Sequence, residues 1–144
     1  MIYIGIDPGL EGAIAVMTPE GILLHDMPVV RTPKGQYDAA AMAGLLRLYA
    51  GDRQARAVLE AVSGRPGQGT ASARSIGIGY GVWLGLLAAL EIGHQSVPPG
   101  VWKRTLGLLK ADKAASRARA VELYPEVAGR LTRVKDHGRA EALL

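Results

Sequence analysis

Hydrophobic residues in the first 27 positions follow a pattern that predicts three short strands. Isoleucine occupies every second position of 2–7, and Pro8-Gly9 then imposes a turn. A second apolar run covers 13–17 and a third covers 22–27, with a turn of Thr, Pro, Glu and Gly between them. Three consecutive strands joined by such short connections predict an antiparallel meander.

The remainder of the chain alternates between helical and strand patterns. After a polar loop over 31–37, Asp38 is a suitable N-cap for a helix that continues to Tyr49. The later elements are expected to be a strand over 56–62, a helix over 71–90, a strand over 95–97, a helical turn over 101–106, a helix over 112–123 and a last helix from about 136. This order predicts an α/β protein with a mixed sheet of about five strands flanked by helices, and we expect one domain over 1–144.

The helix over 71–90 carries an unusual row of glycines, at positions 77, 79, 81 and 85. Each glycine costs roughly 1 kcal/mol relative to alanine inside a helix. Such a row indicates the close approach of another backbone or of a partner, so this helix is our candidate for a dimer interface. Trp83 in this helix and Trp102 downstream are expected to pack in the core or at the dimer contact rather than to stack on bases.

Composition excludes several classes of protein. The 144 residues contain no cysteine, which rules out a disulfide framework and a thiolate zinc site. No apolar run reaches the ~18–20 uncharged residues of a membrane span. The N-terminus enters a strand pattern directly and lacks the basic segment of a signal peptide. We therefore expect a soluble, cytoplasmic protein.

The charge of the chain is unevenly distributed. Residues 1–99 carry seven Lys or Arg and eight Asp or Glu, a net of −1, whereas residues 100–144 carry ten and five, a net of +5. This asymmetry indicates a polyanionic partner at the C-terminal third, although a solvated basic helix face has the same composition. The residues that we expect to contact phosphates are Arg65, Lys103, Arg104, Lys110, Lys113 and Arg117. Lys113 and Arg117 are four apart on a helix and would follow phosphates on one side.

Acidic residues stand at the ends of two predicted strands. Asp7 ends the first strand, and Glu60 interrupts an apolar strand just before a glycine-rich loop. A buried carboxylate without partners is costly, so these positions need an explanation. The ordinary explanations are an Asp-Pro-Gly turn for Asp7 and a solvent-facing strand position for Glu60.

A third acidic group lies at the start of the last helix. His137 and Glu141 are four apart and share a helix face, whereas Asp136 is a natural N-cap that could still reach a site from the cap position. The fourth member of a ligand set with Asp7 and Glu60 is therefore open between Asp136 and His137. Oxygen ligands with at most one imidazole suit Mg²⁺ or Mn²⁺, and two such ions ~3.5–4 Å apart serve phosphodiester hydrolysis.

The order of these motifs resembles the RuvC family of Holliday junction resolvases. The opening Ile4-Gly5-Ile6-Asp7-Pro8-Gly9-Leu10 is similar to the first motif of that family, and Leu59-Glu60 resembles its second acidic motif. Three later segments resemble the phage and plastid variant of the family. They are Val97-Pro98-Pro99 with Trp102-Lys103, the helix that carries Lys113, and the final segment Gly138-Arg139-Ala140-Glu141-Ala142-Leu143-Leu144. The likeness spans nearly the whole chain.

The resemblance implies an RNase H-like fold, a homodimer, and two divalent metals that cut symmetric strands of a four-way DNA junction. It makes Asp7, Glu60 and Glu141 metal-binding carboxylates and places Gln68 on a loop that touches the junction. Two departures stand out. Bacterial members usually have an acid or histidine where this chain has Gly138, and the last helix stops at Leu144, which predicts a truncated helix.

Two other functions compete with a metal-dependent resolvase. An actin- or Hsp70-like ATPase also begins with Gly-Ile-Asp-x-Gly on a hairpin, but 144 residues cannot supply its two lobes. A catalytically silent module that binds branched DNA is favoured by the ambiguous fourth ligand and the short last helix. The presence of both Asp7 and Glu60 favours the nuclease.

Overall fold

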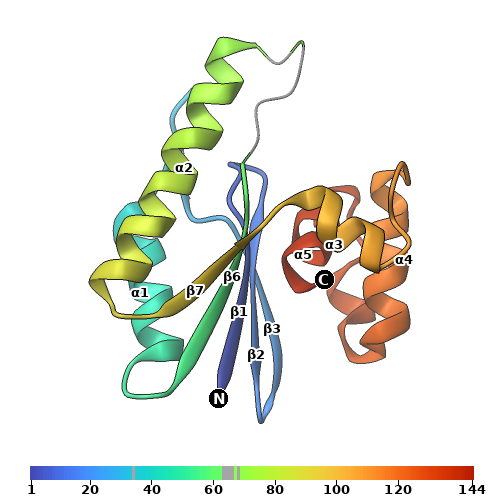
Figure 1. The fold of residues 1–144 in the computed structure, drawn as a ribbon, viewed down its shortest axis with the longest axis horizontal. Helices are drawn as coiled ribbons and strands as arrows, with labels where there is room; N and C mark the ends of the chain where they lie inside the picture. The colour runs from blue at the N-terminus through green and yellow to red at the C-terminus, as the bar shows by residue number, and fades with distance from the viewer. Residues whose placement is uncertain (34, 63–66, 68) are drawn as a thin grey trace.

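The computed structural model describes residues 1–33, 35–62, 67 and 69–144. Its centre is a five-stranded mixed sheet in the order β3-β2-β1-β6-β7, with helices on both faces (Figure 1). The strands are β1 (Ile2–Asp7), β2 (Ala13–Thr18), β3 (Gly21–Asp26), β6 (Ala55–Glu60) and β7 (Gly93–Val97). β1, β2 and β3 form the predicted antiparallel meander, and β1, β6 and β7 run parallel.

Two layers of helices enclose the sheet (Figure 1). Helices α1 (Ala39–Ala50) and α2 (Thr70–Ala89) cover one face. The other face carries α3 (Pro99–Thr105), α4 (Lys113–Leu123) and α5 (His137–Leu143). The predicted α/β class and the order of the main elements are confirmed. Within the described part of the chain, no helix is long and apolar enough to cross a membrane.

The structure differs from the predicted elements where local signals are weak. The loop predicted over 31–37 ends in β5 (Gln36–Tyr37), which pairs with β4 (Val29–Val30), a second short strand that was not predicted. Strands of two residues are too short to show an alternating pattern. Two 3₁₀ segments, η1 (Pro125–Arg130) and η2 (Val134–Asp136), precede α5 and were not anticipated. The strand predicted over 56–62 ends at Glu60.

Strand alternation separates the hydrophobic core from the polar site. Ile2, Ile4 and Ile6 are buried against α1 and α2, in one cluster with Trp83, which is 0% exposed. The core position expected for Trp83 is thereby confirmed. Because successive side chains of a strand point to opposite faces, Asp7 lies on the face that carries α5.

Two glycines allow α5 to lie directly on the sheet. A Cβ at Gly5 in β1 would overlap the carbonyl oxygen of Ala142 in α5. A Cβ at Gly138 would come 2.7 Å from the carbonyl oxygen of Glu11, in the turn between β1 and β2. The backbone at position 138 therefore leaves no room for a side chain unless the turn shifts. The close approach sets the distance between α5 and the end of β1.

The glycines of α2 do not share one role. A Cβ at Gly79 would clash with the ring of Tyr37 and the carbonyl oxygen of Pro8, so this glycine serves packing within the chain. At Gly77, Gly81 and Gly85 no described atom lies within 4 Å of an added Cβ. The expected close approach is confirmed at Gly79 alone, and the other three glycines are exposed.

Candidate active site

The parallel pairing of β1 with β6 brings two carboxylates together. Ile6 pairs with Leu59, so Asp7 and Glu60 stand at neighbouring positions where both strands end. Glu141 reaches the same place from α5. All three line a cleft of about 440 Å³, together with His137. The charged residues Glu11, Lys103, Asp112 and Lys113 complete the polar part of its lining.

The electrostatics of the cleft show that these carboxylates interact. The pKa of Asp7 is raised to about 7, first by burial and then by the negative charges of Glu60 and Glu141. A hydrogen bond from the backbone N–H of Gly9 and the charge of Lys103 oppose this increase without cancelling it. Like charges raise one another's proton affinity, and a cation between them removes that penalty.

Glu60 and Glu141 also accept hydrogen bonds from side chains of the protein. Trp102 Nε1 donates a hydrogen bond of 2.9 Å to Glu60 Oε2. Lys103 Nζ and Ser116 Oγ donate to Glu141 Oε1 at 3.2 Å and 3.1 Å. Among the described residues, no three Asp, Glu or His side chains are grouped closely enough to hold a metal ion in this arrangement. The acidic side chains line one cleft, but the protein's own donors hold two of them.

The donor set nevertheless fits a divalent cation. Three carboxylates and one imidazole in a half-buried cleft are ligands that Mg²⁺ and Mn²⁺ accept. Lys103 places an ammonium group 3.2 Å from Glu141 Oε1, which shows that the site attracts positive charge. A bound cation would replace this charge and would relieve the repulsion that raises the pKa of Asp7.

The structure separates the two candidates for the fourth ligand. His137 lines the cleft, and its Nδ1 lies 3.1 Å from the carbonyl oxygen of Val134. If Nδ1 carries the proton, Nε2 is the atom left to bind a metal. Asp136 is 1% exposed and is not among the described residues that line the cleft. Its carboxylate accepts hydrogen bonds from the backbone N–H and Nε of Arg133, at 2.7 Å and 2.8 Å.

An ionic network that the sequence analysis missed anchors the start of α5. Asp26, the last residue of β3, pairs with Arg139 at 2.7 Å, Arg133 at 3.1 Å and Lys135 at 3.4 Å. Burial opposes ionisation of Asp136, but the hydrogen bonds and charge of Arg133 lower its pKa below the ordinary value. These pairs tie η2 and α5 to the edge of the sheet. Asp136 is thus part of the scaffold that orients Glu141.

The predicted phosphate-binding residues are only partly brought together. Lys103 and Lys113 line the cleft, whereas Arg104 and Lys110 are exposed and outside its described lining. Arg117, four residues after Lys113 on α4, is not among the described residues that line the cleft, and its Nη1 donates to the carbonyl oxygen of Arg133 at 3.1 Å. Arg117 therefore ties α4 to η2. The other two predicted contacts, Arg65 and Gln68, lie outside the described residues.

Two residues of the site were not anticipated in their observed roles. Trp102 was expected in the core or at a dimer contact, but its indole N–H donates to Glu60. Ser116 is buried in α4 and donates to Glu141. Both contacts join residues at least 25 positions apart in the sequence. For Trp102, the one feature of the sequence that hinted at a place near the site is that it directly precedes Lys103.

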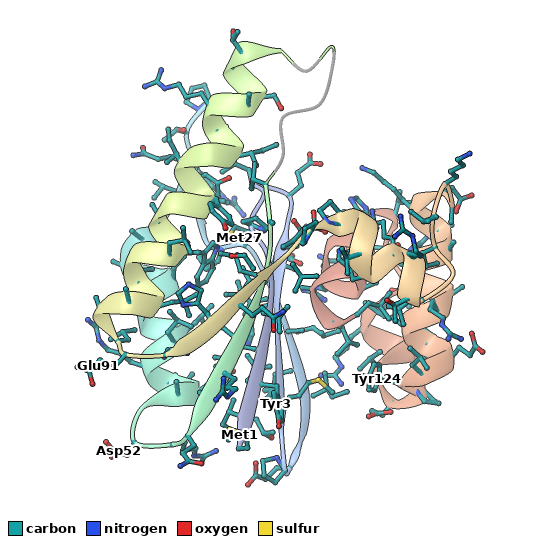
Figure 2. The ribbon with its side chains drawn as sticks, viewed as in Figure 1. Met1, Tyr3, Met27, Asp52, Glu91 and Tyr124 are labelled. Atoms are coloured by element: carbon teal, nitrogen blue, oxygen red, sulfur yellow. The ribbon has the colours of Figure 1, made fainter. Side chains whose placement is uncertain are left out.

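Two further cavities differ in chemistry from the cleft. An open cavity of about 930 Å³ lies at the other end of the parallel strands, lined by residues that include Met1, Asp52 and Glu91 (Figure 2). It contains none of the carboxylates of the cleft. A mainly apolar cavity of about 150 Å³ lies next to the cleft and shares Glu60 and Glu141 with it. These two acids thus stand between a polar and an apolar space.

The raised pKa of Asp7 predicts a change of stability with pH. An acid whose pKa is higher in the folded state than in the unfolded state destabilises the fold as pH rises between the two values, here from about 4 to about 7. In EDTA at pH 8, Asp7→Asn is expected to increase the free energy of unfolding by about 2–4 kcal/mol, with little difference near pH 4. Urea denaturation at both pH values measures this.

Asp52→Asn is the matched control, because it removes the same charge from an exposed residue at the far end of the sheet. We expect it to change the free energy of unfolding by less than about 0.5 kcal/mol. Equal stability of wild type and Asp7→Asn at pH 8 would contradict the raised pKa of Asp7.

The chain is similar to known proteins in sequence over part of its length and in structure over nearly all of it. No protein-family model matches the chain. Over 80 residues, 55% of its length, the chain is 42% identical to the chloroplastic Holliday junction resolvase MOC1 of Chlamydomonas reinhardtii, and it spans only 9% of that protein. Two structures of Thermus thermophilus RuvC superpose on 99% of the chain, with 17% and 19% identity.

The structural likeness to RuvC covers most of this chain and most of each RuvC chain. RuvC in complex with a Holliday junction substrate gives a TM-score of 0.61 and is covered to 89% of its length. A second RuvC structure gives 0.65 and is covered to 92%. The chain therefore has the RNase H-like fold of RuvC, and over 80 of its residues it is similar to a chloroplast Holliday junction resolvase.

Proposed function

We propose that this chain is a structure-selective endonuclease that resolves Holliday junctions by metal-dependent hydrolysis. One observation carries the proposal: Asp7, Glu60 and Glu141 converge from β1, β6 and α5 on a single cleft. The fold of this chain is that of RuvC, and a protein similar to it in sequence is named as a Holliday junction resolvase. The cleft supplies the carboxylates that such chemistry requires.

The residues of the cleft have distinct roles in this mechanism. Asp7, Glu60 and Glu141 would hold two Mg²⁺ or Mn²⁺ ions, with His137 as a fourth ligand. The chemistry that such a pair supplies is activation of water and stabilisation of the leaving oxygen. Ser116 orients Glu141 through its hydrogen bond. No side chain needs to act as a covalent nucleophile, because water is the attacking group.

The DNA would enter the cleft along its basic wall. Lys103 and Lys113 line the cleft and are the groups best placed to hold the phosphates next to the scissile bond. Arg104 and Lys110 are exposed beyond them and would extend the contact. Contacts of this kind position the backbone of DNA and do not read its sequence.

We also propose that the protein acts as a homodimer through α2. Symmetric cleavage of a four-way junction requires two active sites, and one chain provides one cleft. Gly77, Gly81 and Gly85 present an open backbone on one side of α2, and Ile78 on the same side is 48% exposed. Glycines at this spacing let two helices approach closely, and the apolar side chain between them gains from burial.

One observation favours the alternative of a silent module that binds branched DNA. The acidic side chains are held by Trp102, Lys103 and Ser116 and do not form a preassembled metal site in the described part of the chain. A module of this kind would bind junctions through its basic residues and leave them intact. Activity of the wild type decides between the two functions.

Nicking of a synthetic four-way junction tests the proposal. In Mg²⁺ or Mn²⁺ the wild type is expected to produce symmetric nicks. Asp7→Asn and Glu141→Gln should lower the rate by more than about 100-fold, because losing a metal ligand costs more than losing a hydrogen-bond partner of a ligand. Denaturing gel electrophoresis of end-labelled strands gives the rates and the positions of the cuts.

The same assay contains the controls. Asp52→Asn should cut at the rate of the wild type, and all variants should bind the junction in EDTA. Normal cutting by Asp7→Asn would overturn the assignment of the site. Binding without cutting by the wild type would identify the silent module, and ATP turnover without cutting would identify the ATPase.

Replacement of an exposed glycine in α2 tests the dimer. Gly81→Arg places a long charged side chain where the helices would meet, and we expect it to convert the dimer into a monomer in sedimentation velocity. Gly44→Arg makes the same change at an exposed glycine of α1 that also faces open space and should leave the dimer intact. A wild type that is monomeric at micromolar concentration would contradict this interface.

A further inference from the structure

We propose that Trp102 is the positioning residue for Glu60, and that its indole N–H sets the affinity of the site for divalent metal. This inference rests on the proposed function, since it assigns the residue that orients one of the proposed metal ligands. The inference concerns the orientation of the Glu60 carboxylate. Knowing which residues bind the metal does not determine that orientation.

The geometry of the contact is specific. Trp102 Nε1 lies 2.9 Å from Glu60 Oε2, at the normal length of a hydrogen bond from nitrogen to oxygen. An indole has one N–H and no acceptor, so it can only donate to this carboxylate. The bond occupies one oxygen of the carboxylate, Oε2.

The backbone fixes the position of the donor. Glu60 pairs with Val97 across β6 and β7, and the N–H of Ala61 donates to the carbonyl oxygen of Val97 at 2.8 Å. Pro98 and Pro99 then stop the strand and begin α3, whose first turns carry Trp102. The donor is therefore five residues from the strand partner of its acceptor. This short connection leaves little freedom in the distance between them.

The surroundings separate the donor from the reacting side of the carboxylate. Trp102 lines the apolar cavity of about 150 Å³ and is not among the described residues of the polar cleft, whereas Glu60 lines both. The indole thus holds Glu60 from the apolar side. Hydrogen bonds are stronger in such surroundings than in water, because no water competes for the acceptor. A ligand carboxylate that is held in this way keeps one orientation as metal binds.

The next residue links this contact to the other acid. Lys103 Nζ lies 5.0 Å from the centroid of the Trp102 ring and 3.2 Å from Glu141 Oε1. Two consecutive residues of α3 therefore contact Glu60 and Glu141, which come from different elements. If Trp102 served only for packing, its ring would be needed but its N–H would not. A variant that keeps an aromatic ring and lacks the N–H separates the two roles.

Trp102→Phe keeps an aromatic ring and removes the donor. We expect the dissociation constant for Mn²⁺, measured by isothermal titration calorimetry without DNA, to rise about 10-fold or more. Junction affinity in EDTA should stay within about 2-fold of the wild type, and so should the metal-independent unfolding transition. Trp83→Phe makes the same exchange at the other, core tryptophan and should leave the Mn²⁺ affinity unchanged.

Several outcomes would overturn the inference. An unchanged Mn²⁺ affinity in Trp102→Phe would show that the N–H does not orient Glu60. An equal loss of junction affinity in EDTA would show a general structural role. If Trp102→Phe does not fold, the Trp83→Phe variant provides a second test, because Trp102 is then the sole tryptophan. Mn²⁺ bound at the site must quench the fluorescence of Trp102. Absence of quenching would overturn the proposal.

The proposed function can fail separately. A wild type that binds Mn²⁺ but leaves junctions intact would reject the nuclease, and the comparison of Mn²⁺ affinities would still decide the role of Trp102. A wild type that cuts junctions, with equal Mn²⁺ affinity in Trp102→Phe, would reject the positioning role alone.

Discussion

The burial of Asp7 beside two other carboxylates is the constraint on which the rest of the structure depends. Burial raises the pKa of Asp7 to about 7, and the negative charges of Glu60 and Glu141 add to this increase. Such a group opposes folding, so the chain has to hold it together by other means. Donors from α3 and α4 offset part of the repulsion, and a divalent cation would offset much more.

The scaffold that imposes this arrangement lies on both sides of α5. On the sheet side, Gly5 and Gly138 remove the side chains that would keep the helix away from β1 and its turn. At the start of the helix, Asp26 and Asp136 form ion pairs with Arg133 and Arg139. Close packing and paired charge together set where Glu141 stands.

The features that the sequence predicted correctly are those that depend on local order. Alternating isoleucines identified β1 and its buried face, and Asp38 was readable as a helix cap, which the hydrogen bond that it accepts from the backbone N–H of Ala41 confirms. Asp7 and Glu60 were recognisable because a charge at the end of an apolar strand is unusual. Helix periodicity placed His137 and Glu141 on one face, and both line the cleft.

The features that were missed depend on contacts between distant segments. The donor of Glu60 is 42 residues away in the chain, and the partner of Asp26 in α5 is 113 away. Neither has a local pattern that a sequence could reveal. The glycines of α2 show the same limit, because nothing in their local sequence separates Gly79, which packs against Tyr37, from the three glycines that face outward.

Anomalous scattering from crystals of the wild type grown with Mn²⁺ tests the central claim most directly. The account predicts two peaks ~3.5–4 Å apart among Asp7, Glu60 and Glu141, with the ammonium of Lys103 displaced from Glu141 and the indole of Trp102 still bound to Glu60. Mn²⁺ bound elsewhere, or no Mn²⁺ at these carboxylates at saturating concentration, would contradict it.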